Sequence, residues 1–120
     1  MESISQLRAA LAASPATIDL FLPSGSSWFL DGAPLPIGER CNVTIRNEGS
    51  GALLDAAQRS RILEVERSAW LRLEMITLAN GLSPLAAGGA TLISSGAEVE
   101  MLSCNLSSNV AAHGGAAAII

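Results

Sequence analysis

Apolar and polar residues alternate along most of this chain, in short runs bounded by Gly, Ser, Asn or Asp. Alternation over a few residues predicts β-strands whose apolar side chains face one side. The runs that we predict as strands lie at 18–22, 28–30, 42–46, 61–65, 70–74 and 97–101. The pattern therefore predicts many short strands rather than a few long ones.

The apolar positions of these runs repeat in rows, with a period of about 28 residues that falls within the range of known repeat architectures. The rows are Ile18, Val43, Leu71 and Val99; Leu20, Ile45, Leu73 and Met101; Val65, Ile93 and Ile120; and the pairs Ile76 with Cys104 and Leu78 with Leu106. The first step, from Ile18 to Val43, and the last, from Ile93 to Ile120, are slightly shorter than the others. Such a period is typical of stacked parallel strands. We therefore predict an all-β parallel solenoid with three strands per turn and about four turns.

The N-terminal segment has a helical period instead. Residues 3–14 place Leu7 and Leu11 on one face, and a proline follows. A helix this short is marginal in water, so its apolar stripe must pack on another element. We expect it to cover the open end of the strand coil, which gives a capping helix at 1–15 and a solenoid at 16–120.

Side chains between the inward rows point outward, because strand side chains alternate. The same register sets Arg46 beside Glu74 and Arg72 beside Glu100. Neighbouring strands lie about 4.8 Å apart, so we expect opposite charges on successive rungs. An exposed pair contributes less than about 1 kcal/mol. We therefore interpret these charges as a solvated face that supports the register.

Composition and net charge limit the classes of binding partner that the sequence predicts. Apolar residues make up 49% of the 120 residues, charged residues make up 15%, and the net charge is −4. A globular core is expected from these values, whereas nucleic acids and anionic membranes bind basic surfaces. The apolar runs are too short to span a bilayer. We predict no nucleic-acid binding and no membrane insertion, and the sequence shows no signal peptide.

Five segments resemble a known family. They are 17–25, 42–49, 52–55, 61–65 and 104–116. Together with the helix they resemble pectin-lyase-like right-handed parallel β-helices, and the last segment is closest to the repeats of polymorphic outer-membrane and adhesin-like proteins. The resemblance covers nearly the whole chain, but its patterns of Gly, Asn and aliphatic residues specify fold more than function. It implies a surface or secreted protein that binds or cleaves polysaccharide, or that presents a long scaffold.

Members of this family usually have more turns than this chain provides. The chain ends inside an expected strand at Ile119 and Ile120. A bare last rung offers unpaired N–H and C=O groups to other strands. We therefore expect an N-terminal fragment, with its C-terminal edge covered by further turns or by a partner chain.

We predict no catalytic, cofactor-binding or metal-binding residues. The resemblance implies clustered carboxylates holding Ca²⁺ for a lyase, or Asp residues with a His for a hydrolase. Asp19, Asp31 and Asp55 fall in different strands or turns. Glu98 and Glu100 share one face, but nothing gives them the two different environments that a glycosidase pair needs.

The remaining polar candidates are interpreted as structural. His113 lies in an Ala-Ala-His-Gly-Gly run and is expected in a loop without a special role. Cys41 and Cys104 are expected to be unpaired, partly buried thiols with Cα atoms about 10 Å or more apart. Asn80 and Asn109 are expected to hydrogen-bond along a ladder of turns.

The resemblance thus implies a structural or adhesive scaffold segment of a surface or secreted protein, in contact with glycans. The alternative is a polysaccharide lyase or glycoside hydrolase whose active site lies outside this chain. Two Gly-Gly-Ala segments, at 88–90 and 114–116, are interpreted as corners of the coil rather than binding loops.

Overall fold

The computed structural model describes residues 4–12, 17–47, 49, 51–87, 91–94, 96–113 and 117–119. One helix, α1, spans Ile4–Ala12. The strands are β1 (Thr17–Phe21), β2 (Ser27–Phe29), β3 (Leu35–Ile37), β4 (Asn42–Arg46), β5 (Ala52–Asp55), β6 (Leu63–Val65), β7 (Trp70–Glu74), β8 (Ile76–Ala79), β9 (Leu82–Ala87), β10 (Thr91–Ile93), β11 (Glu98–Leu102), β12 (Asn105–Ser107), β13 (Val110–His113) and β14 (Ala117–Ile119).

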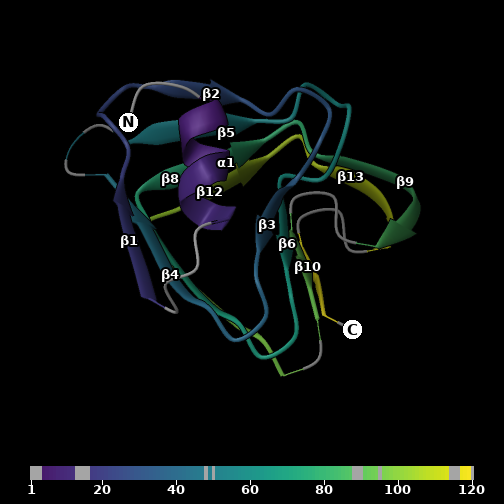
Figure 1. Ribbon diagram of the computed structural model, residues 1–120. Coiled ribbons are helices and arrows are strands. Elements are labelled where there is room, and N and C mark those ends of the chain that lie inside the picture. Colours follow the sequence, from purple (N-terminus) through teal and green to yellow (C-terminus); the bar gives the residue numbers. More distant parts are fainter. Residues whose placement is uncertain are drawn as a thin grey trace.

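Three parallel sheets form the walls of a solenoid, as predicted (Figure 1). Sheet A has the order β1-β4-β7-β11, sheet B the order β2-β5-β8-β12, and sheet C the order β3-β6-β10-β14. Because each wall contains four strands, about three complete turns separate β1 from β11, slightly fewer than the four predicted. In Figure 1 the chain runs clockwise from β1 through β2 to β3 and then recedes to β4. The coil is therefore right-handed, as parallel crossovers almost always are.

A fourth, two-stranded sheet pairs β9 with β13. The prediction of three strands per turn did not include it. It also changes the position of His113, which ends β13 and pairs with Ala87 rather than lying in a loop. The loop assignment of His113 was therefore wrong.

The inward rows on sheet A have the predicted register. Ile18 lies opposite Val43, Val43 opposite Leu71, and Leu71 opposite Val99. The row that ends at Met101 is in register as well. On sheet C the row ends differently, because Ile93 pairs with Ile119 and not with Ile120.

Helix α1 covers the first rung of the coil. It is shorter than predicted, and residues 3 and 13–16 lie outside the described part. Leu7 and Leu11 are buried in the common core. Arg8 donates hydrogen bonds to the carbonyl oxygens of Leu30, Ala33 and Pro34, the last at 2.9 Å. The helix thus supplies both apolar cover and polar partners at this end.

The corners of the coil use left-handed backbone conformations. Arg40, Ser68 and Gly96 have φ values of 59°, 59° and 76°. They are evenly spaced along the chain, with the same step that separates Val43 from Leu71. Such φ values are uncommon outside glycine. The repeat of the strands therefore extends to the turns. Both Gly-Gly-Ala segments lie outside the described residues, so their expected role as corners stays a prediction.

Candidate functional site

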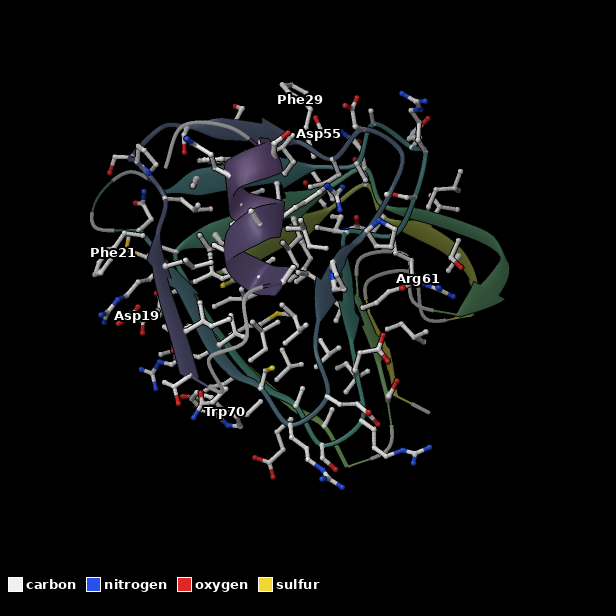
Figure 2. The ribbon with its side chains drawn as sticks, in the orientation of Figure 1. Asp19, Phe21, Phe29, Asp55, Arg61 and Trp70 are labelled. Carbon is white, nitrogen blue, oxygen red and sulfur yellow. The ribbon has the colours of Figure 1, made fainter. Side chains whose placement is uncertain are left out.

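The outward face of sheet A carries aromatic, basic, acidic and amide side chains. Figure 2 shows Asp19, Phe21 and Trp70 along the outside of this wall, whereas Phe29 lies on another wall. The side chains of this face are Thr17, Asp19 and Phe21 from β1; Asn42, Thr44 and Arg46 from β4; Trp70, Arg72 and Glu74 from β7; and Glu98, Glu100 and Leu102 from β11. We call this set the sheet A face.

One corner of the sheet A face is built around Phe21, whose side chain is 47% exposed. The guanidinium carbon of Arg46 lies 4.4 Å from the centre of the Phe21 ring, which is a cation–π arrangement. The same guanidinium pairs with Asp19 at 2.6 Å. A surface depression of about 300 Å³ adjoins Phe21 and continues along Leu22, Pro23 and Ser24. This corner therefore offers an aromatic edge beside a shallow hollow.

A second aromatic position is Trp70, at the start of β7. Its neighbours across the sheet are Asn42 on β4 and Glu98 on β11. The residue is half-buried, whereas Asn42 and Glu98 are exposed. The register thus places Trp70 between a residue with a side-chain amide and a residue with a carboxylate. Along the strand, Arg72 follows on the same face.

Arg72 links the last two rungs of this face. It donates hydrogen bonds to Glu74 at 2.7 Å and to Glu100 at 3.2 Å. The hydrogen bond to Glu74 is the largest influence on the pKa of Arg72 and raises it, which the charge of Glu100 reinforces. Arg72 therefore stays cationic. Both predicted alignments are confirmed, because Arg46 lies opposite Glu74 and Arg72 lies opposite Glu100. Arg72 forms an ion pair with Glu100, whereas Arg46 forms its ion pair with Asp19 on the preceding rung.

Phe21 ends β1 and Trp70 begins β7, so the two aromatic positions lie at opposite ends of strands that are two positions apart in sheet A. Phe21 is in register with Arg46 and Glu74, and Trp70 begins the strand that Glu74 ends. Strand geometry then separates the two Cα atoms by about 13 Å along the strands and about 10 Å across the sheet. A ligand touching both must therefore be extended, such as an oligomer.

The acidic residues considered for catalysis do not converge. Asp19 lies on sheet A, Asp31 in the turn after β2, and Asp55 at the end of β5 on sheet B. Glu98 and Glu100 share the sheet A face and are both exposed. Within the described residues, no group of three or more His, Cys, Asp or Glu side chains is placed to hold a metal ion. No helix in that part of the chain is long and apolar enough to cross a membrane.

The two cysteines and two asparagines have the structural surroundings that we predicted. Cys41 and Cys104 are free and half-buried. Asn109 donates to the Leu78 carbonyl of the preceding rung at 3.1 Å and accepts from the Gly81 N–H at 2.8 Å. Asn80 donates to Asp55 at 3.1 Å. Both asparagines therefore link successive turns.

Sequence reasoning missed the asparagine with the most backbone hydrogen bonds of the three, which is Asn47. Its side-chain oxygen accepts from the N–H groups of Gly49 and Gly51 at 2.8 and 2.9 Å, and its amide donates to the Leu22 carbonyl at 2.9 Å. The signal was present in the chain. Asn47 follows β4 and precedes a Gly-Ser-Gly turn, where an asparagine commonly bonds the backbone two residues on.

The aromatic positions of the sheet A face were also missed as a candidate site. Phe21 and Trp70 both fall at polar positions of the alternation, and an apolar residue there is the available signal. The chain was compared with protein families, curated proteins and solved structures. No family profile, curated protein or solved structure matches it. The site must therefore be interpreted from its own geometry.

Proposed function

We propose that this chain is a structural or adhesive β-solenoid segment of a surface or secreted protein, and that it contacts glycans through the sheet A face. The observation that carries the proposal is Trp70 between Asn42 and Glu98. A sugar ring has apolar C–H faces and a rim of hydroxyl groups. An indole held on a flat wall can stack against the face, while the amide and the carboxylate bond the hydroxyls.

The rest of the sheet A face supports an extended ligand. Phe21 offers a second apolar contact next to the depression of about 300 Å³. Arg72 and Thr44 lie between the two aromatic positions and supply donors. Side chains projecting from stacked strands are held at fixed spacings, which suits a polymer of regular repeat.

The resemblance to pectin-lyase-like and adhesin-like β-helices belongs to this proposal. The parallel sheets with a short N-terminal helix fit that type of fold. In the proposed role the solenoid is a rigid spacer, and the C-terminal edge is covered by further turns or by a partner chain. A surface or secreted location follows from the same role.

Binding to a glycan array, followed by titration of the best oligosaccharide, tests the glycan contact. We expect Trp70→Ala and Glu98→Gln to weaken binding by about tenfold, equivalent to about 1.4 kcal/mol. The matched control is Phe29→Ala, which removes a 58% exposed aromatic side chain from sheet B. Binding that survives Trp70→Ala but is lost in Phe29→Ala would contradict the assignment.

The same protein separates a binding role from the enzyme alternative. Incubation with pectin-like and other polysaccharides should release neither unsaturated nor reducing sugar ends. Release of either product, sensitive to substitution of Glu98 or Glu100, would replace the scaffold role with lyase or hydrolase chemistry.

A further inference from the structure

Among the described residues, the strands β11 and β12 form the last edge of the coil. Each is the terminal strand of its sheet, since β11 pairs with β7 and β12 pairs with β8. On the opposite side of both strands, the described residues provide no ladder partner for the backbone N–H and C=O groups. Such an edge is a template for another strand.

The apolar interior is also uncovered at this edge. Leu71 and Leu73 on β7 are 0% exposed, but Val99 and Met101, which lie opposite them on β11, are only half-buried. On sheet B, Leu106 is half-buried where its partner Leu78 is buried. Another rung with inward apolar residues would complete these rows.

The outward side of the edge carries negative charge. Glu98 and Glu100 of β11 are exposed, and Glu100 is bonded on one side to Arg72 of the rung below. A second copy docking through the same edge would bring these carboxylates against their own counterparts, and like charges on neighbouring strands are unfavourable. A second copy docking through its N-terminal end would meet α1 instead. The charges therefore disfavour self-association and favour a cationic partner.

We propose that the edge of β11 and β12 binds an extended segment of a partner chain as a further parallel rung. The segment alternates apolar residues facing inward with Arg or Lys facing outward over Glu98 and Glu100. Arg72, bonded to Glu100 at 3.2 Å across one rung, shows how such a cation is placed. Backbone pairing provides affinity and the cations fix the register, as in strand-addition complexes. The inference rests on the proposed scaffold role, in which this end of the coil binds another part of the scaffold.

Fluorescence anisotropy with labelled synthetic peptides tests the proposal on the 120-residue protein. The probe peptide alternates Val with Arg. Two matched peptides replace Arg by Glu, or carry N-methyl groups on alternate backbone amides so that they cannot pair. We expect the basic peptide to bind at least about tenfold more tightly than either control, which corresponds to about 1.4 kcal/mol or more.

Charge reversal locates the contact. The double variant Glu98→Arg with Glu100→Arg should reverse the preference, so that the acidic peptide binds better than the basic one. The matched control Glu39→Arg changes an exposed charge at a corner of the coil and should leave the preference unchanged. Both reversals are on exposed side chains, and circular dichroism checks that the strands persist.

Two results would overturn the proposal. One is equal binding of the basic, acidic and N-methylated peptides. The other is a dimer in analytical ultracentrifugation that is lost when Val99 is replaced by Asp, because this would make a second copy the occupant. Failure here is distinguishable from failure of the glycan proposal, since Trp70→Ala should weaken glycan binding and leave peptide binding intact.

Discussion

The two ends of the described coil have the same kind of apolar interior, but α1 covers the first rung and no described element covers the last. At the N-terminal end, Leu7 and Leu11 of α1 pack onto the first rung, and Ile18 and Leu20 are buried. At the other end the equivalent row positions, Val99 and Met101, are half-buried. A repeat buries its interior only between neighbouring rungs, so a different element must end it.

The two ends of the coil also differ in their polar contacts. Arg8 bonds three carbonyl oxygens at the corner between β2 and β3. At the edge formed by β11 and β12, the described residues include no equivalent cap, and Glu98 and Glu100 stand outward. The first rung is therefore capped by both apolar and polar contacts, whereas the last described rung leaves its apolar rows partly exposed.

The largest expected effect compares one interior row on two rungs. Leu73→Ala removes a fully buried side chain and should cost about 2–5 kcal/mol of unfolding free energy. Met101→Ala, at the position in register on the last described rung, should cost about 1 kcal/mol or less because its side chain is already partly hydrated. Urea denaturation of both variants measures the difference. Equal losses would mean that the last rung is as well covered as the third.

The next effect concerns the asparagines that link rungs. Asn47 is 5% exposed and satisfies three backbone groups, so Asn47→Ala should cost about 2–4 kcal/mol. Asn109 makes the corresponding link near the last described rung but is half-buried, so water can replace its bonds. We expect Asn109→Ala to cost about 1 kcal/mol. A reversed order in thermal unfolding would refute the distinction between the first rung and the last described rung.

Removing the polar part of the N-terminal cap should have an intermediate effect. Arg8→Met keeps much of the apolar stem and removes the guanidinium, and we expect a loss of about 1–3 kcal/mol, since bonds to a charged group are lost at three carbonyls. The control Arg67→Met removes an exposed arginine and should change stability by less than about 0.5 kcal/mol. Indistinguishable melting temperatures would argue against the capping role of Arg8.

The smallest effect is expected for the ion pairs of the sheet A face. Arg72→Gln breaks its contacts with Glu74 and Glu100, and all three side chains are partly exposed to water. The loss should be less than about 1 kcal/mol and should shrink further in high salt. A loss above about 2 kcal/mol that persists in about 1 M salt would give these charges a larger structural role than their exposure allows.

The rows of the interior could be predicted from sequence because their spacing is nearly constant. Val43, Leu71 and Val99 occur at one step and fall on one wall. The predicted register is wrong at the last strand, where Ile119 rather than Ile120 pairs with Ile93. The step along this row is two residues shorter in the last turn, which matches the register shift between Ala111 and His113 on β13. Two adjacent isoleucines satisfy the apolar pattern equally well, so the sequence pattern did not reveal the shorter step.

The strand β3 was not predicted because Pro36 lies at its centre. Proline cannot donate to a ladder and usually argues against a strand. Here β3 is the edge strand of sheet C, and its neighbours Leu35 and Ile37 make the ladder bonds to the next rung at 2.8 and 2.9 Å. The missing N–H of Pro36 therefore costs no bond. Whether a strand lies at the edge of a sheet depends on the order of all strands in that sheet, and a local sequence pattern does not reveal this order.

The corners of the coil and the candidate site could not be predicted from local sequence patterns either, because both depend on residues in neighbouring rungs. Arg40 and Ser68 adopt left-handed conformations without the glycine that normally marks them, so the neighbouring rungs must impose the turn. The candidate site at Trp70 depends on Asn42 and Glu98, which lie one full turn of the coil before and after Trp70 along the chain. These neighbours become visible only once the register is applied to the outward positions as well as the inward ones.

Residue-resolved amide hydrogen exchange tests the central claim most directly. The claim is that the parallel coil is covered by α1 at its first rung and uncovered at its last described rung. Amides of β4 and β7 that donate within the sheets should exchange only through global unfolding, and those joining β1 to β4 should be nearly as slow. Amides of β11 that donate to β7 should exchange at least about tenfold faster through local opening of the last rung. Equal protection of β1 and β11, or faster exchange at β1, would contradict the account.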